Sequence, residues 1–220
     1  MNLNEFTKLP NYQITKCRES PLRLFVAIDL DEAARRAVAA EQRRLKEEIG
    51  HDSRPTLKWV RPEHMHLTLA FLGTVDERTT AVLVDAMREA MAYREFEVEF
   101  GGVGAFPPRG APRVLWMGLR RGERDVVEVQ RLVGARLVRI GVELERRPFH
   151  PHLTLARWRE PRTTDRSRAL RLDSSTVVAR IHVRAVALVH SQLSQAGPTY
   201  SVLCEARLAD EPGQPLKSSS

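Results

Sequence analysis

The tetrapeptide His-Leu-Thr-Leu occurs twice in this chain of 220 residues, at residues 66–69 and again at residues 152–155. Each copy lies in a segment with the residue alternation of a β-strand, and similar helix-like and strand-like segments lie between the copies. An identical tetrapeptide in matching contexts indicates an internal repeat. The repeat therefore predicts two related half-structures, each of which contributes one equivalent strand.

Helix-like and strand-like segments alternate along the middle of the chain, without a low-complexity linker. We expect strands at residues 22–29, 57–60, 65–72, 96–103, 113–119, 152–157, 177–188 and 200–208. We expect helices at residues 31–49, 78–93, 123–140 and 165–172, and a Gly/Pro-rich loop at residues 104–112. This order predicts an α+β fold with mostly antiparallel strands.

Composition limits the class of protein. The chain has 35 Lys and Arg against 28 Asp and Glu, a net charge of +7 that favours polyanions such as RNA but also fits an ordinary solvated basic surface. Cys17 and Cys204 form no Cys-x-x-Cys pattern, so we expect a cytoplasmic protein without a disulfide scaffold. No apolar run approaches the roughly 20 residues of a membrane span, so we expect no membrane association.

The two ends of the chain differ from its middle. Residues 1–21 are polar and unpatterned, and residues 209–220 are rich in Pro, Gly and Ser. We expect a flexible N-terminal extension over residues 1–21, one domain over residues 22–208, and a C-terminal tail over residues 209–220.

The chemistry of the repeated motif follows from strand geometry. Side chains alternate between the faces of a strand, so His66 and Thr68 project together, as do His152 and Thr154, while the leucines project to the other side. If the two strands lie side by side, two imidazoles and two hydroxyls converge on one cleft. One imidazole can then act as a general base and the other as a general acid, while the hydroxyls donate hydrogen bonds to phosphoryl oxygens. A single His-x-Thr motif would not indicate catalysis, because its histidine would be an ordinary one near a sheet edge.

A metal site is an alternative interpretation of the same region. His64 with His66, and His150 with His152, form two His-x-His pairs that could bind zinc through four imidazoles. Pro151 places the second pair in an extended lead-in to its strand, and zinc binding would leave both threonines unexplained. We therefore expect neither a metal nor an organic cofactor.

The two motifs and the residues around them resemble those of a known family. The first motif reads His66-Leu-Thr-Leu-Ala-Phe-Leu-Gly73, and the second reads Phe149-His-Pro-His-Leu-Thr-Leu-Ala-Arg157. Further matching residues are Leu22–Asp29, Trp59-Val60, Pro62-Glu63, Pro112–Trp116, Ser191, Leu193, Gly197 and Tyr200. These residues resemble the two-histidine (2H) phosphoesterase superfamily, and within it the LigT-like RNA 2′,3′-cyclic phosphodiesterases, also called the 2′-5′ RNA ligase family.

The resemblance implies a bilobal fold with two pseudo-symmetric lobes, each an antiparallel sheet with outer helices, around a central cleft. It implies hydrolysis of RNA 2′,3′-cyclic phosphate ends to 2′-phosphomonoesters by a monomer without cofactors, and 2′-5′ RNA ligation as the reverse reaction. In such families the first motif histidine is the general acid on the O3′ leaving group and the second is the general base on water. These roles carry over to His66 and His152, and they exchange in the reverse direction.

Four further residues are candidates for the site. Arg157 matches a phosphate-binding position of the family, but regular alternation from His152 would turn it to the face of the leucines, so it requires a bulge, a strand end or a long reach. Arg113 is a second candidate phosphate ligand or a surface arginine. Phe149 and Tyr200 could stack on a base, although either could belong to the core.

Two rival functions remain at this point. A module that binds RNA or nucleotides without catalysis would keep the cleft, but it should show a degraded motif, and both motifs are intact. A phosphodiesterase could also act on another cyclic or 2′-5′ nucleotide, such as ADP-ribose 1″,2″-cyclic phosphate or 2′-5′ oligoadenylate. Relatives typically begin near the Leu22 strand, so the first twenty or so residues depart from the family pattern.

Overall fold

The computed structural model describes residues 21–49, 57–144, 147–171, 176–194 and 197–209. The expected terminal segments lie outside these ranges, apart from Pro21 and Ala209, and so does Cys17. No helix within the described ranges is long and apolar enough to cross a membrane.

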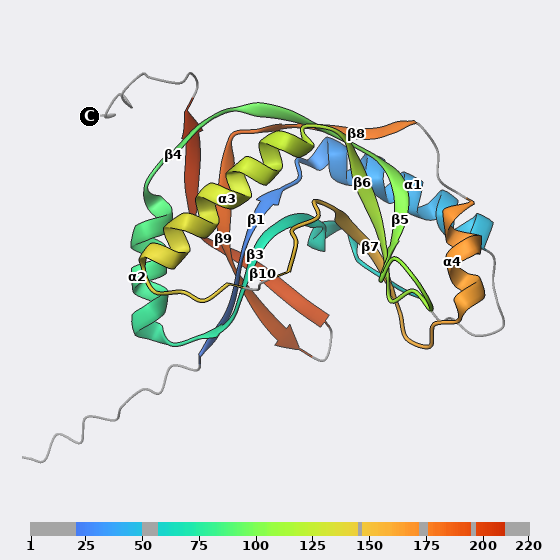
Figure 1. The fold of residues 1–220 in the computed structure, drawn as a ribbon, viewed down its shortest axis with the longest axis horizontal. Coiled ribbons are helices and arrows are strands. Elements are labelled where there is room, and N and C mark those ends of the chain that lie inside the picture. The colour runs from blue at the N-terminus through green and yellow to red at the C-terminus, as the bar shows by residue number, and fades with distance from the viewer. Residues whose placement is uncertain (1–20, 50–56, 145–146, 172–175, 195–196, 210–220) are drawn as a thin grey trace, which may run out of the picture.

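The described residues form a mixed α+β structure, which confirms the expected fold class (Figure 1). The helices are α1 (Glu32–Ile49), the 3-10 helix η1 (Pro62–His64), α2 (Glu77–Arg88), α3 (Glu123–Arg139) and α4 (Thr163–Leu170). The strands are β1 (Leu22–Asp29), β2 (Leu57–Trp59), β3 (His66–Val75), β4 (Met91–Arg94), β5 (Phe96–Phe106), β6 (Val114–Arg121), β7 (Leu153–Trp158), β8 (Val177–Val183), β9 (Ala185–Ser194) and β10 (Gly197–Ala209).

The ten described strands form one sheet in the order β4-β10-β9-β1-β3-β7-β6-β5-β8, with β2 paired to β7. All described pairs are antiparallel except β10 with β4. The sheet has two halves of matching order, because β3 and β7 lie innermost, β1 and β6 come next, and β9 and β5 follow. The halves are joined at β3 and β7 through one residue pair, Leu67 opposite Leu153.

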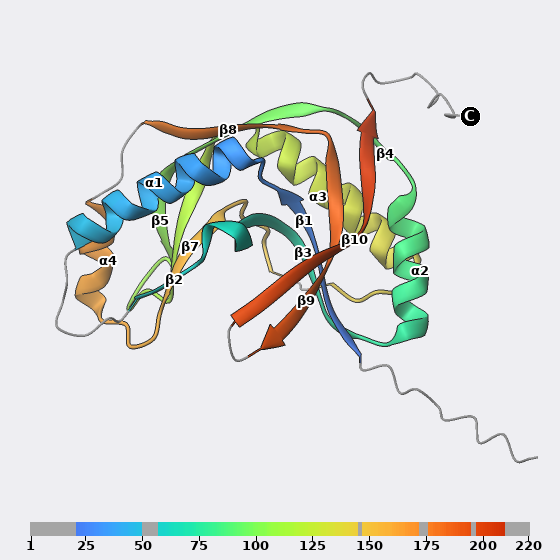
Figure 2. The ribbon, with the colours of Figure 1, turned by 180° about the vertical axis from the view of Figure 1, so that it is seen from behind.

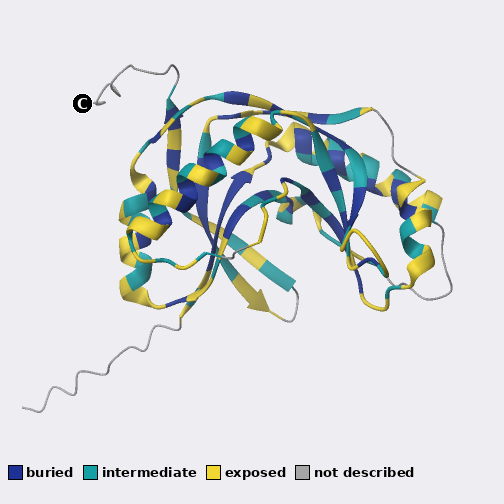
Figure 3. Ribbon diagram, in the orientation of Figure 1, coloured by how far each residue is buried: buried dark blue, intermediate teal, exposed yellow. Residues whose placement is uncertain are grey.

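The helix that follows β1 and the helix that follows β6 each cross to the opposite half of the sheet. Helix α1 packs against β8, whereas α3 packs against β3 and β4 (Figures 1 and 2). The face of each helix that contacts the sheet is apolar, as Val38 and Leu45 of α1 and Val129 and Val133 of α3 are fully buried. Buried residues concentrate where these helices meet the strands, and exposed residues lie on their outer sides (Figure 3).

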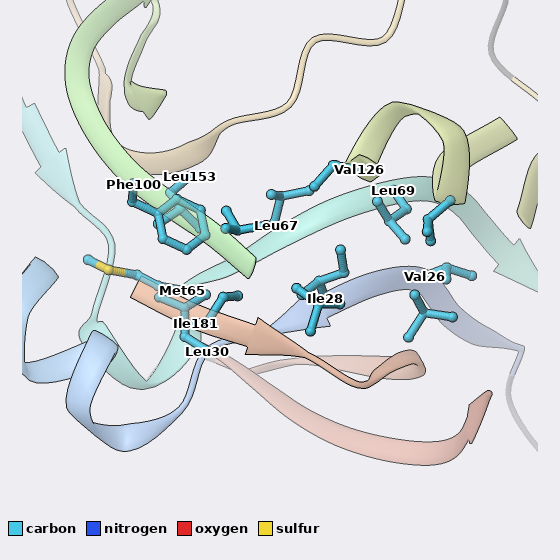
Figure 4. Close-up of a cluster of buried hydrophobic side chains, with 14 of the residues drawn as sticks. Val26, Ile28, Leu30, Met65, Leu67, Leu69, Phe100, Val126, Leu153 and Ile181 are labelled. Atoms are coloured by element: carbon cyan, nitrogen blue, oxygen red, sulfur yellow. The ribbon is translucent and has the colours of Figure 1, made fainter. Parts of the chain in front are cut away.

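One apolar core runs beneath the junction of the two halves. Leu67 and Leu153 are both fully buried, and they lie among Met65, Phe100 and Ile181 (Figure 4). Burying a side chain of this size stabilises a fold by about 1.5–3 kcal/mol. The leucines of the repeated motif therefore hold the halves together and leave the other face of β3 and β7 for polar side chains.

The structure corrects three expected segments. The loop expected at residues 104–112 begins only after Phe106, where β5 ends. The helix expected to reach residue 93 ends at Arg88, and β4 follows because Met91 is buried and pairs with Leu208 of β10. The strand expected at residues 177–188 divides at Arg184, where the chain leaves the β5 edge in one half and enters β9 beside β1 in the other.

Candidate active site

The junction of β3 and β7 brings both His-x-Thr pairs into one cavity. Because Leu67 lies opposite Leu153 in an antiparallel pair, position 66 lies beside position 154 and position 68 beside position 152. The histidine of each half is therefore next to the threonine of the other half. All four polar side chains line a cavity of about 980 Å³.

A backbone carbonyl orients each motif histidine in the same way. His66 Nδ1 lies 2.9 Å from the carbonyl oxygen of His64, and His152 Nδ1 lies 2.7 Å from that of His150. A carbonyl oxygen only accepts hydrogen bonds, so each Nδ1 carries the hydrogen. Each Nε2 is then the nitrogen available for proton transfer to or from a ligand.

Aromatic rings surround both imidazoles. Phe25 stacks on His66 with a centroid separation of 4.5 Å, and Tyr200 meets His66 edge-on at 5.4 Å. Phe106 meets His152 edge-on at 5.1 Å. Burial lowers the pKa of His66 to about 4, and it also lowers the pKa of His152 from its ordinary value of 6.5. Both imidazoles are therefore neutral in the ligand-free site at pH 7.

A β-bulge resolves the orientation of Arg157. On β6, Leu115 pairs with Ala156 and Trp116 with Thr154, so Leu155 is an extra residue on β7. Leu155 and Ala156 are consecutive and both fully buried, which shifts the alternation by one residue. Arg157 is consequently exposed and lines the cavity with Thr154.

The first half contains the same bulge, and it exposes a residue that the sequence reasoning missed. Ala27 pairs with Thr68 and Val26 with Ala70, so Leu69 is the extra residue on β3. Phe71 follows the bulge, is 60% exposed, and lines the cavity. Aligning the two motifs would have found it, because Phe71 occupies the position in the first copy that Arg157 occupies in the second.

The other expected residues also line this cavity. Arg113 and Tyr200 are on its wall, and Phe149 is on the wall while also packing against the core. Within the described part of the chain, no three His, Cys, Asp or Glu side chains gather in a way that could hold a metal ion. This arrangement does not favour the four-imidazole alternative.

Two polar residues of α1 hold the backbone behind the site, and no local pattern in the sequence marks either of them. Arg35 donates from Nη1 to the carbonyl oxygens of Pro62, Glu63 and Met65 at 3.0–3.2 Å, in the segment that leads into His66. Gln42 is the buried polar side chain of the described core, and its Nε2 donates to the carbonyl oxygens of Val60 and Leu155 at 2.8 and 2.9 Å. Gln42 thus contacts the extra residue of the β7 bulge.

Comparisons with known proteins identify the family of this chain. The family model described as LigT like Phosphoesterase matches residues 30–116 and 120–200. A protein of Aeropyrum pernix named RNA 2′,3′-cyclic phosphodiesterase is 33% identical over 76% of this chain and 94% of its own length. A protein of Methanothermobacter thermautotrophicus with the same name is 34% identical over 82% of this chain and 95% of its own length.

Solved structures share the fold. A crystal structure of a protein from Thermus thermophilus has a TM-score of 0.66 at 26% identity and covers 84% of this chain and 97% of its own. E. coli LigT complexed with 3′-AMP has a TM-score of 0.63 at 25% identity and covers 86% of this chain and 98% of its own. With the matched residues extending from Leu30 to Tyr200, the chain belongs to the LigT-like phosphoesterase family of two-histidine enzymes.

Proposed function

We propose that this protein hydrolyses RNA 2′,3′-cyclic phosphate ends to 2′-phosphomonoesters. The observation that carries the proposal is the convergence of two His-x-Thr pairs and Arg157 on one cavity. Relatives that share about a third of their residues with this chain bear the name of this activity, and E. coli LigT has been crystallised with a mononucleotide.

The reaction divides between the two histidines. His152 Nε2 removes a proton from water as the water oxygen attacks phosphorus, and the bond from phosphorus to O3′ breaks. His66 Nε2 donates a proton to the departing O3′. The lowered pKa of His152 keeps it neutral, as a base must be. His66 must be protonated to act as the acid. The negative phosphate that binds beside it raises the pKa of His66 and so favours the protonated form.

The remaining groups hold the phosphate and the nucleoside. The hydroxyls of Thr68 and Thr154 donate to the non-bridging oxygens, where charge must be stabilised in the transition state. The guanidinium of Arg157 can make a bidentate contact with the same group. Phe71 offers an exposed ring for the terminal base, with Tyr200 and Phe149 as further aromatic walls.

Ligation uses the same site with a different nucleophile. The 5′-hydroxyl of a second RNA takes the place of water, attacks the cyclic phosphate, and displaces O3′ from phosphorus while the histidines transfer the same two protons. The product is a 2′-5′ linkage, so ligation runs in the same direction as hydrolysis and keeps the histidine roles, which corrects the expectation that it is the reverse reaction. Only cleavage of the linkage back to the cyclic phosphate exchanges the roles of the two histidines. RNA 2′-5′ ligation therefore needs no further groups, and the supply of RNA ends relative to water decides whether it occurs.

A panel of substrates tests the proposal. RNA ending in a 2′,3′-cyclic phosphate, ADP-ribose 1″,2″-cyclic phosphate and 2′-5′ oligoadenylate would each be incubated with the protein, and products would be resolved as 2′- or 3′-phosphates. We expect the RNA end to react fastest and to give the 2′-phosphate. Tight binding of all three without turnover would support a binding module instead. Activity that EDTA abolishes and zinc restores would contradict the metal-free mechanism.

A further inference from the structure

The cavity is lined by more positive charge than the His-x-Thr chemistry explains. Four cations that this chemistry does not need line it: Lys58, Arg61, Arg113 and Arg147. We call these four residues the cationic wall. All four are exposed, and among the described residues that line the cavity there is no Asp or Glu. Aromatic residues line the same cavity, including Phe71 and Tyr200.

The sheet register brings one member of this wall beside the catalytic phosphate site. Lys58 on β2 lies directly opposite Arg157 on β7, so the two side chains project from the same face. Arg113 lies next to Val114, which is opposite Arg157 on the other flank. Like charges placed directly opposite each other destabilise a sheet, by up to about 1 kcal/mol. The register therefore concentrates positive charge where only an anion could offset it.

The described residues do not neutralise this charge. Within the described parts of the chain, no side-chain hydrogen bond or ion pair joins any of the four cations to another residue, although many other arginines are paired with carboxylates. One cyclic phosphate carries a single negative charge, and Arg157 with the two threonine hydroxyls already serves it. The cationic wall therefore exceeds what the reacting group needs.

We propose that the cationic wall binds the phosphodiester backbone of a single RNA strand on the 5′ side of the reacting terminus, an inference that rests on the proposed function. Proteins that hold single strands combine a positive groove along the backbone with aromatic rings on which bases stack. This cavity contains both kinds of group. The terminal phosphate lies at the His-x-Thr pairs, the terminal base meets Phe71, and the preceding phosphates follow the cationic wall.

The test compares substrates that differ only in upstream phosphates. Adenosine 2′,3′-cyclic phosphate, its 5′-phosphorylated form, and a trinucleotide with the same cyclic end would be hydrolysed by wild-type protein, and kcat/KM would be measured for each. We expect the trinucleotide to exceed the mononucleotide by roughly tenfold, the scale of one charge-assisted contact. The advantage should shrink as salt rises, because phosphate binding releases counterions.

Variants then assign the advantage to the wall. The double variant Lys58→Gln with Arg61→Gln should reduce the ratio of trinucleotide to mononucleotide kcat/KM to about two or less, because these two cations would supply most of the roughly tenfold advantage. Arg78→Gln, an exposed arginine of α2 outside the cavity, removes one charge and should leave the ratio unchanged. The 5′-phosphorylated mononucleotide separates an isolated phosphate from a continuous strand, because it should recover only part of the advantage.

The outcomes are distinct from those of the proposed function. A wild-type ratio near one, or a ratio that the double variant retains, would overturn the backbone site while leaving hydrolysis of the cyclic phosphate intact. Wild-type protein that hydrolyses none of the three compounds would overturn the proposed function and this site with it. A 5′-phosphorylated mononucleotide as good as the trinucleotide would overturn the extended-strand inference.

Discussion

Replacing Gln42 by leucine should loosen the bulge that turns Arg157 into the cavity. The Gln42 amide lies in the core and donates two hydrogen bonds, one to the carbonyl of Val60 and one to that of Leu155. Leucine has a similar volume and no donor, so the change removes the two bonds without opening a large cavity. The carbonyl of Leu155 keeps its bond from the Val60 amide at 2.9 Å, whereas the Val60 carbonyl loses the Gln42 amide as a donor.

The size of the effect follows from these bonds. Each lost hydrogen bond costs about 1 kcal/mol net, and a partly buried carbonyl left without its donor adds about 1 kcal/mol or more. We therefore expect Gln42→Leu to lower the free energy of unfolding by about 2–3 kcal/mol. Displacement of Arg157 should also reduce kcat/KM by at least about tenfold, the equivalent of one weakened charge-assisted contact.

Two measurements separate support of the site from support of the fold. Urea unfolding gives the free energy of unfolding, and hydrolysis assays under conditions where the variant is fully folded give kcat and KM. Gln42→Glu is the matched variant, since its protonated carboxyl can donate to one carbonyl while the ionised form can donate to neither. Burial raises the pKa of this carboxyl in the folded state, so the variant should lose stability as pH rises above about 4.3, the ordinary pKa of glutamate. A Gln42→Leu protein that is less stable but fully active would refute the link between Gln42 and Arg157.

Three further perturbations follow from the site. The profile of kcat/KM against pH should be a bell with its maximum below pH 6.5, because the base must be neutral, the acid must be protonated, and burial lowers the pKa of both His66 and His152. The profile of kcat should peak at higher pH, since bound phosphate raises both pKa values. A kcat/KM maximum above about pH 7 would contradict the burial argument. Phe71→Ala should raise KM for cyclic-phosphate RNA by roughly tenfold or more, as loss of one base stack costs about 1–3 kcal/mol, whereas Phe71→Tyr should restore binding; equal KM values for the two variants would rule out stacking. Leu67→Ala should lower the free energy of unfolding by about 3–5 kcal/mol in a denaturation experiment, because the buried leucine joins the two halves, and a loss below about 1 kcal/mol would show that the junction does not depend on it.

The repeated motif allowed much of the site to be predicted from local pattern alone. Strand alternation correctly indicated that the leucines of both copies are buried and that the polar side chains face the other way. The side-by-side arrangement of β3 and β7 was a hypothesis from the repeat, and the pairing of Leu67 with Leu153 confirms it. The sequence also showed that the orientation of Arg157 was uncertain, because regular alternation would place its side chain on the face of the leucines and not in the cavity.

The features that escaped prediction depend on tertiary contacts. The bulge at Leu155 is set by pairing with β6 and by Gln42, which is far away in the chain. The sequence around Gln42 does not indicate that its side chain donates to two carbonyl groups that are distant in the chain. The short strand β4 forms because Met91 finds a partner in β10, and the same residues alone continue a helical pattern. Strand pairing thus overrides local propensity at both places.

Hydrolysis by the two single histidine variants and their double variant tests the central claim most directly. Wild-type protein should convert a cyclic-phosphate RNA end to the 2′-phosphate, and His66→Ala and His152→Ala should each lower kcat at least about a hundredfold, on the order of one general acid or base. Because the two groups act in the same step, the double variant should be little worse than either single variant. The unfolding transition of each variant serves as the control for folding. Turnover at the wild-type rate by a folded variant lacking either imidazole would contradict paired acid and base catalysis.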